Sequence, residues 1–160
     1  MRWRGRESRA ELVGRLYDEY GASLFRYALM LLADHSAAED AVQQVFAAVM
    51  RPAAALENPA YYLRRAVRNE CYSALRRRTH QPSLAEPLLE PVVPEKVSAE
   101  ERIALERALV SLPVEQREVV HLHIFEGMTF KEVAEASGES INTVASRYRY
   151  AIDKLRIELA

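Results

Sequence analysis

Apolar residues recur at three- and four-residue steps along most of the chain, as they do on the buried face of an α-helix. Four of these patterns begin at a capping box, a Ser or Thr followed three residues later by Glu, which marks a helix N-terminus. The boxes are Ser8–Glu11, Ser36–Glu39, Ser98–Glu101 and Thr129–Glu132. Asn58–Pro59 predicts a fifth start, with Asn as the cap and Pro at the first helical position. Residues that favour strands do not alternate over a strand's length, so the sequence predicts an all-α fold.

The periodic segments predict helices over residues 8–33, 36–51, 60–78, 98–110 and 114–126, followed by a pair of helices between 129 and 159. The segment from Thr79 to Val97 is different, because it holds four of the seven prolines and shows no periodicity. That composition is typical of an extended, mobile linker. We therefore expect two small helical domains, residues 1–78 and 98–160, joined by a flexible linker at 79–97.

The pair of helices from Thr129 to Leu159 has the spacing of a helix-turn-helix. Gly138 ends the first helix because glycine tolerates the left-handed backbone of a helix C-terminus, and Ser140 caps the second helix. In this motif the second helix enters the major groove of DNA. Its predicted buried stripe is Ile141, Val144, Ala145, Tyr148, Ile152 and Leu155. The other face carries side chains that can bind phosphates and base edges, namely Asn142, Thr143, Ser146, Arg147, Arg149 and Tyr150.

The predicted helix over 60–78 is strongly basic. Six arginines oppose Glu70 alone, a local balance of +5, and Tyr61, Tyr62 and Tyr72 lie among them. Aromatic rings beside arginines suit single-stranded nucleic acid, since every base has a face that can stack on a ring. In the alternative interpretation, the tyrosines pack into the core and the arginines form a solvated edge. The cluster as a whole favours a surface that contacts phosphates.

Charge limits how this chain can bind DNA. The net charge of −1 and the pI of about 6.4 exclude a uniformly basic nucleic-acid coat, so contacts must come from local patches. Residues 140–160 carry four basic and two acidic side chains. That surplus is weak for a protein that binds DNA unaided, because neutralised phosphates supply most of such affinity. An ordinary helical hairpin with a solvated polar face is therefore the alternative for this stretch.

The remaining composition bears on location. Cys71 is the only cysteine, which excludes an intramolecular disulfide and fits a reducing compartment. The first residues are charged and lack the apolar core of a secretory signal. The longest apolar run, Tyr27 to Ala33, is far too short to span a bilayer. We expect a soluble, cytoplasmic protein without membrane insertion.

From about Leu12 to Leu159 the chain resembles a bacterial extracytoplasmic-function (ECF) sigma factor, the smallest class of sigma-70-type initiation factors. The N-terminal resemblance rests on YDEYGASLFRYALMLLADHSAAEDAVQQVF and YYLRRAVRNECYSALRRR. The C-terminal resemblance rests on LPVEQREVVHLHIFEGMTFKEVAEASGESINTVASRYRYAIDKLR. The two parts in this order, separated by a Pro-rich linker, are the specific feature.

The resemblance implies a binding factor, without catalysis or cofactor, that directs core RNA polymerase to promoters and assists their melting. The helix with Glu39, Asp40, Gln43, Gln44 and Phe46 is similar to the one that docks on the β′ clamp helices, and the β flap is a further expected contact on core polymerase. The residues similar to those that recognise and melt the −10 element are Tyr62, Arg65, Arg68, Asn69 and Arg76. The helix from Ser140 to Ile152 resembles the reader of the −35 element. Such factors are commonly held by an anti-sigma factor.

Two positions depart from the family pattern. Tyr62 stands where a Trp is usual, and a Tyr ring covers less of a stacked base. Ser73 stands where an Asp is common, so a carboxylate that pairs with nearby arginines is lost. Promoter melting is therefore expected to be weaker or differently selective.

Two other function classes remain as alternatives. A free-standing helix-turn-helix regulator that dimerises through its N-terminal half needs neither the acidic/Gln face nor the Arg/Tyr helix. An enzyme needs a site, and Cys71, inside a predicted helix, is the sole thiol nucleophile. The four histidines lie in scattered segments, and His121 and His123 point to different helix faces, which makes them a poor metal pair. The acidic Glu39–Asp40 pair is explained by a helix start, where an acid in the first turn favours the helix dipole.

Overall fold

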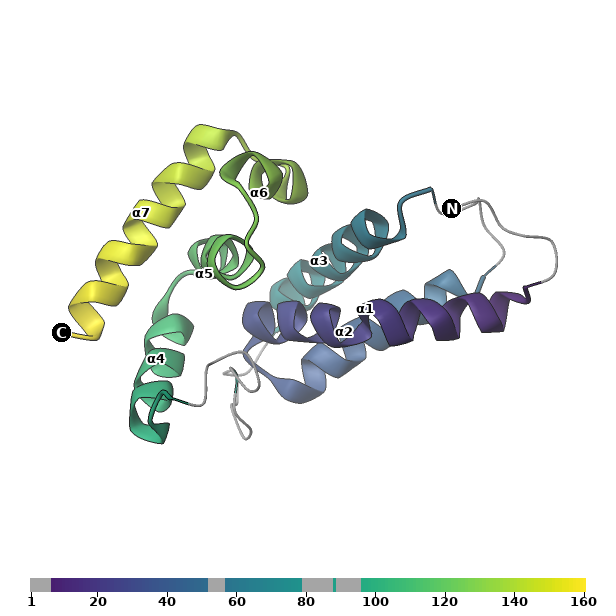
Figure 1. Ribbon diagram of the computed structural model, residues 1–160, viewed down its shortest axis with the longest axis horizontal. Coiled ribbons are helices and arrows are strands. Elements are labelled where there is room, and N and C mark those ends of the chain that lie inside the picture. The colour runs from purple at the N-terminus through teal and green to yellow at the C-terminus, as the bar shows by residue number, and fades with distance from the viewer. Residues whose placement is uncertain (1–6, 52–56, 79–87, 89–95) are drawn as a thin grey trace. The chain divides into compact units, whose positions relative to one another are not determined.

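The structure is a computed structural model that describes residues 7–51, 57–78, 88 and 96–160. The elements in chain order are α1 (Arg9–Leu32), α2 (His35–Val49), α3 (Pro59–Arg77), α4 (Ala99–Ser111), α5 (Val114–Val120), the π-helix η1 (His121–Phe125), α6 (Phe130–Ser137) and α7 (Ile141–Glu158) (Figure 1). The described ranges contain no strand, so the all-α prediction is confirmed. None of the helices described combines the length and the apolar character needed to cross a bilayer.

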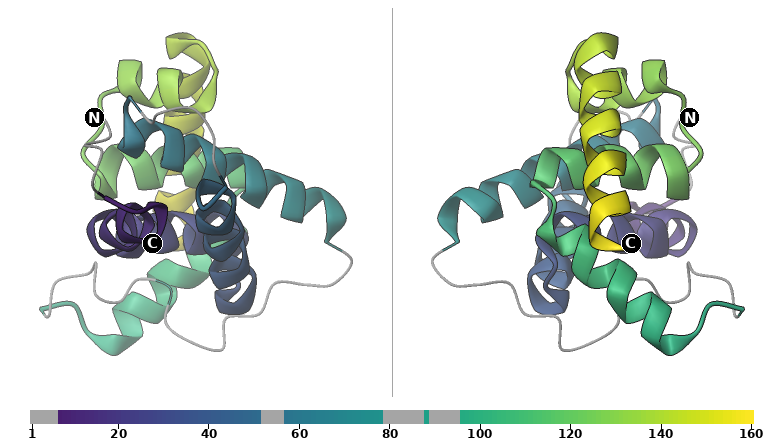
Figure 2. Two further views of the ribbon diagram at one scale, coloured as in Figure 1. Left: turned by 90° about the vertical axis from the view of Figure 1, so that its right-hand side faces the viewer. Right: turned by 90° about the vertical axis from the view of Figure 1, so that its left-hand side faces the viewer.

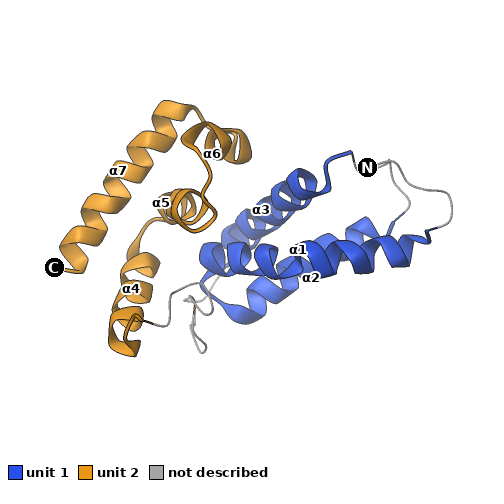
Figure 3. Ribbon diagram, in the orientation of Figure 1, with its two compact units in different colours: residues 1–85 blue, residues 86–160 orange. Residues whose placement is uncertain are grey.

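The chain separates into two compact units, Met1–Ala85 and Glu86–Ala160 (Figure 3). Unit 1 contains α1 to α3, and unit 2 contains α4 to α7 with η1. Two helical units, the second with a helix-turn-helix, agree with the predicted fold class. The linker predicted over 79–97 lies almost wholly outside the described residues.

Unit 1 is a bundle in which each of α1, α2 and α3 packs against the other two. Its core is built from side chains at helical spacing, and the most deeply buried include Leu16, Tyr27, Leu31, Leu63, Val67 and Cys71. Two arginines bind the carbonyls that a helix end leaves without an intrahelical donor. Arg9 Nε donates to the Val49 carbonyl at 2.7 Å, and Arg78 Nη2 donates to the Leu32 carbonyl at 2.6 Å. These bonds fix the ends of α2 and α1.

The start of α2 differs from the prediction. The cap is Asp34, whose Oδ1 accepts the Ala37 N–H at 3.0 Å, so the predicted box at Ser36–Glu39 is wrong. Ala33, with φ 50°, ends α1 in the left-handed region, and the extended Asp34 can begin the next helix at once. Asp40 therefore lies in the second turn of α2, and the dipole explanation for its acidity no longer applies.

In unit 2, α5 and α6 pack against the long helix α7, drawn in yellow, and η1 packs against α5 and α6 (Figure 2). Val119, Leu122, Val133, Val144 and Ala151 are at most 1 % exposed and form the centre of its core. The end of α4 is bound by two cations. Arg117 Nη1 donates to the Val110 carbonyl at 3.1 Å, and Lys154 Nζ donates to the Ser111 carbonyl at 2.8 Å.

The helix predicted over 114–126 changes to a π-helix at His121. The Glu126 N–H donates to the His121 carbonyl at 3.0 Å, five residues back, and this wider turn rotates the following side chains. Ile124, an apolar residue of the predicted helix, is consequently 48 % exposed, whereas His121 is only 3 % exposed. Gly127, with φ 70°, then ends the segment in the left-handed conformation that favours glycine.

Candidate nucleic-acid and partner interfaces

Helix α2 presents one polar face to solvent. Glu39, Asp40, Gln43 and Gln44 are all exposed, whereas the opposite face packs into the unit 1 core. The three- and four-residue steps between these side chains place them on neighbouring rows of the helix. The sequence-predicted polar residues of α2 are therefore brought together on one accessible surface.

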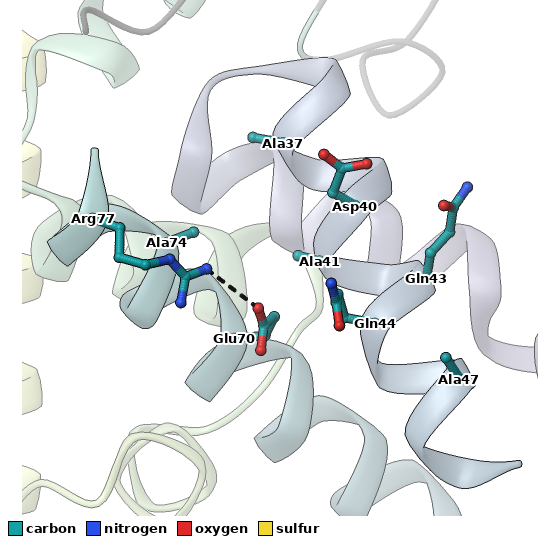
Figure 4. Close-up of a pocket in the computed structure, with 9 residues that line it drawn as sticks. All are labelled: Ala37, Asp40, Ala41, Gln43, Gln44, Ala47, Glu70, Ala74 and Arg77. Carbon is teal, nitrogen blue, oxygen red and sulfur yellow. Dashed lines mark ion pairs between the residues drawn. The ribbon is translucent and has the colours of Figure 1, made fainter. Parts of the chain in front are cut away.

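A groove of about 430 Å³ runs beside this surface, between α2 and α3 (Figure 4). Helix α2 contributes Ala37, Asp40, Ala41, Gln43, Gln44 and Ala47, and α3 contributes Glu70, Ala74 and Arg77. Arg77 Nη2 lies 3.5 Å from Glu70 Oε1 along the α3 wall. Sequence reasoning missed the three α3 residues, although their steps of four and three residues place them on one face. Alanines between polar side chains leave room for a partner segment to approach the backbone.

Phe46 does not belong to this exposed surface. It is 6 % exposed, and its ring meets the Tyr17 ring edge to face with centroids 5.2 Å apart. In this structure Phe46 therefore supports α2 from the core side, and the expectation that it contacts a partner directly is corrected. The edge-to-face pair adds to the packing that holds α2 on α1.

Helix α3 exposes the aromatic rings near its N-terminus. Tyr61 and Tyr62 are 48 % and 44 % exposed, while Leu63, Val67 and Cys71 bury the other face completely. The alternative in which these two tyrosines pack into the core is therefore wrong. Each ring is available to stack on a base.

The predicted DNA-binding residues of α3 lie on adjoining rows of one surface. Tyr62, Arg65, Asn69 and Arg76 are exposed and follow at steps of three, four and seven residues. Arg68 sits beside them, with its guanidinium carbon 4.4 Å from the centre of the Tyr72 ring. This is a cation–π contact, which orients the guanidinium without neutralising it.

Ser73 retains part of the contact expected of an aspartate. Its Oγ accepts a hydrogen bond from Arg76 Nη2 at 2.9 Å. The hydroxyl thus orients this guanidinium, but it brings no negative charge. Arg76 therefore has an oriented guanidinium without a carboxylate partner at position 73.

The helix-turn-helix has the local structure that its sequence predicts. Thr129 Oγ1 accepts the Glu132 N–H at 3.2 Å and starts α6, and Gly138, with φ 72°, ends it. Ser140 Oγ accepts the Thr143 N–H at 3.1 Å and donates to Thr143 Oγ1 at 2.9 Å. The N-terminus of α7 is therefore fixed by hydrogen bonds within the motif.

The buried stripe of α7 is shifted from its predicted position. Val144, Ala151 and Leu155 are buried and Tyr148 is half-buried. Ile141, predicted to belong to the stripe, is 49 % exposed, because the first residue of α7 lies at the turn, one helical turn before the packed residues begin.

The predicted DNA-binding residues of α7 divide into two groups. Asn142, Arg149 and Tyr150 are exposed, and the Arg149 guanidinium carbon lies 5.3 Å from the centre of the Tyr150 ring. Thr143, Ser146 and Arg147 are half-buried. The Thr143 hydroxyl belongs to the helix cap, and Arg147 Nη2 donates to Glu139 Oε1 at 3.2 Å.

An aromatic cluster behind α7 was not predicted from the sequence. His123 lies with its ring centroid 4.6 Å from that of Phe130 and 4.9 Å from that of Tyr148. Its Nδ1 is 2.7 Å from the Met128 carbonyl oxygen, so Nδ1 carries the proton and donates. The cluster joins η1, α6 and α7 and fixes the depth at which α7 sits in unit 2.

His121 faces a different partner from His123. Its Nε2 lies 3.1 Å from Glu126 Oε1. Across the described ranges, no group of three or more His, Cys, Asp or Glu side chains is placed to hold a metal ion. Both histidines serve the local packing of η1.

Two carboxylates with lowered pKa values lie at the starts of helices. The Glu101 pKa is lowered because its carboxylate accepts hydrogen bonds from Ser98 in the capping box of α4. The Glu7 pKa is lowered by its hydrogen bond with Arg15. Both groups bind within their own helical segment and stabilise it locally.

Comparison with known proteins identifies two conserved domains. Residues 16–81 match the family described as sigma-70 region 2, and residues 102–155 match sigma-70 region 4. The ECF RNA polymerase sigma factor SigL of Mycobacterium tuberculosis is 33 % identical over 165 residues, covering 94 % of this chain and 90 % of SigL. SigM of the same organism is 31 % identical over 136 residues, covering 83 % of this chain and 69 % of SigM.

A solved structure is also similar. It is the sigma factor RpoE from Bartonella quintana in complex with the anti-sigma factor NepR, with a TM-score of 0.72 and 25 % identity. The match covers 91 % of this chain and 95 % of that one.

Proposed function

Because this chain belongs to the ECF family of RNA polymerase sigma factors, we propose that the three surfaces described above divide the work of such a factor. Like its family, it directs RNA polymerase to promoters at the start of transcription. The α2 surface docks on core polymerase, the α3 surface binds and melts the −10 element, and the outward face of α7 reads the −35 element.

The docking proposal is supported by the exposed row Glu39, Asp40, Gln43 and Gln44 beside the groove. Polar side chains around a floor of alanines suit a helical partner that brings its own polar side chains. We assign the β′ clamp helices of core polymerase to this surface and the β flap to unit 2. Phe46 contributes by holding α2 in place from the core.

The −10 proposal is supported by the exposed Tyr62 ring among arginines of one face. Unstacking a base costs a few kcal/mol, which is offset when the flipped base stacks on an aromatic ring. Arg65, Arg68 and Arg76 bind the backbone phosphates around that base, and Asn69 binds a base edge. The Tyr62 ring is smaller than the Trp usual in the family, so it covers less of a stacked base.

The −35 proposal is supported by the local geometry of α7. In a helix-turn-helix, residues in the N-terminal part of the second helix reach base edges. Asn142 can bind adenine through two hydrogen bonds, and Arg149 can bind guanine in the same way. Thr143, Ser146, Arg147 and Tyr150 complete the predicted set.

The net charge of −1 and the small basic surplus over residues 140–160 support binding of the promoter as part of a larger assembly rather than by this chain alone. Core polymerase carries both units, and joining two weak modules raises the effective concentration of each at its site. We infer that the chain acts by binding, without catalysis, in the cytoplasm where polymerase works. RpoE is bound to an anti-sigma factor in the similar structure, and we infer a restraining partner of that kind here.

Two experiments test the proposed function together. Purified full-length protein should co-elute with core RNA polymerase and support run-off transcription from specific genomic fragments. A chain that never associates with core, or that binds a duplex tightly and selectively by itself, would refute it and favour a free-standing regulator. A dimer of the free protein with intact DNA selectivity would point to the same alternative.

A further inference from the structure

Arg147 lies on a different row of α7 from the side chains that face outward. Asn142, Ser146 and Arg149 follow at steps of four and three residues, so they share one face, on which Asn142 and Arg149 are exposed and Ser146 is half-buried. Arg147 instead precedes Ala151 by four residues, and Ala151 is fully buried. The Arg147 side chain is only 25 % exposed. Arg147 therefore sits at the edge of the buried stripe rather than on the outward face.

The partner of Arg147 is part of the turn. Arg147 Nη2 donates to Glu139 Oε1 at 3.2 Å, and the Glu139 backbone N–H donates to the Ala134 carbonyl at 3.1 Å. Glu139 also lies between Gly138, the end of α6, and Ser140, the cap of α7. One residue is thus bound to α6 through its backbone and to α7 through its side chain.

We propose that Arg147 is a positioning residue, which fixes the angle between α6 and α7 through Glu139 while base reading falls to the outward face. The inference rests on the proposed function, which assigns α7 to the −35 element, and it changes the role of one residue in that set. A pair of opposite charges brings no net charge to the duplex, so it adds little to the phosphate neutralisation that sets salt dependence. What the pair supplies is the orientation of Asn142, Ser146 and Arg149.

A charge-swap experiment tests this inference. Holoenzyme is first assembled from bacterial core polymerase and the protein. It is then used to select promoter fragments from a library randomised at the −35 element. Arg147→Glu is expected to lower use of the selected element about tenfold, since an ion pair is lost and like charges are opposed. The double variant Glu139→Arg/Arg147→Glu is expected to restore it to within about threefold, because the ions meet again across the turn.

Arg149 provides the matched control, since it is an exposed arginine of the same helix. Arg149→Glu should lower use of the element, and adding Glu139→Arg should not restore it. Arg149→Ala should reduce the slope of log affinity against log salt by about one, whereas Arg147→Ala should leave that slope unchanged.

Two results overturn the positioning role. One is that the double variant Glu139→Arg/Arg147→Glu uses the selected element as poorly as Arg147→Glu alone. The other is that the slope of log affinity against log salt falls equally in Arg147→Ala and Arg149→Ala. Either result means that Arg147 binds DNA directly. A wild-type holoenzyme that ignores the upstream sequence would refute the assignment of α7 itself, which separates failure of the proposed function from failure of this inference.

Discussion

The rings of His123 and Tyr148 meet edge to face, with centroids 4.9 Å apart and an interplanar angle of 79°. This contact joins the π-helix to α7, the helix that carries the residues proposed to face DNA. The π-helix matters here because its wider turn is what places His123 behind α7 while His121 turns into the core.

Replacing His123 with Ala should lower the free energy of unfolding of unit 2. The variant loses the ring contacts with Phe130 and Tyr148 and the hydrogen bond to Met128, each worth about 1 kcal/mol, so a loss of about 3 kcal/mol is expected. Urea unfolding of the full-length protein measures it. Ile124→Ala, on the exposed side of the same π-helix, is the control and should stay within about 0.5 kcal/mol of wild type. Equal losses in the two variants would contradict the assigned role of His123.

The start of α2 can be tested with two alanine substitutions. Asp34→Ala removes the acceptor of the Ala37 N–H and should cost about 1 kcal/mol in the free energy of unfolding, as the loss of an N-cap does. Ser36→Ala removes an exposed side chain that caps nothing and should be nearly neutral. The reverse order of the two effects would restore the box originally predicted at Ser36.

Asp40→Ala should weaken holoenzyme formation while leaving the fold intact. If Asp40 contributes to docking at the level of an interface hot spot, at least about 2 kcal/mol, the affinity for core polymerase falls about thirtyfold or more. Asp18→Ala, an exposed aspartate on α1, is the control and should bind like wild type. Binding is measured by competition of each variant with wild type for core polymerase, and the fold is checked by circular dichroism. Undiminished binding by the Asp40 variant would remove α2 from the docking surface.

Changes at Tyr62 should act on promoter melting. Tyr62→Ala removes a stacking platform worth about 1–3 kcal/mol, so open-complex formation should fall sharply, and Tyr62→Trp should raise it above wild type. Fluorescence of 2-aminopurine in the −10 element reports the unstacking. Supplying a template already melted at that element should recover part of the activity of the Ala variant. No gain from the melted template would mean that the ring acts before melting.

The elements that the sequence predicted well are those set by residues close together in the chain. Ser8 and Ser98 each form the expected capping box, because both partners of a box lie within one turn of helix. At Ser36 the same signature was present but Asp34 was used instead, since the left-handed Ala33 lets the next helix begin earlier. A capping-box sequence shows that an N-cap residue is available, whereas the end of the preceding helix determines which residue becomes the N-cap.

The errors at the candidate sites have a different origin. The exposure of Ile124 follows from the π-helix, whose extra residue per turn depends on packing that a helical period does not reveal. The resemblance assigned Phe46 to the docking surface, whereas its spacing from Val42 and Val49 places it on the buried face, where it packs against Tyr17. In the sequence Arg147 is indistinguishable from the other basic residues of its helix. Its proposed role depends on the Glu139 carboxylate, eight residues earlier.

The hydrogen bond from Arg78 to the Leu32 carbonyl has a consequence for the α3 surface. Arg78 directly follows α3, so the end of α3 is tied to the end of α1 by one side chain. If α3 binds the −10 element as proposed, a substitution at Arg78 would act on that surface through the support of the helix and not through a contact with DNA.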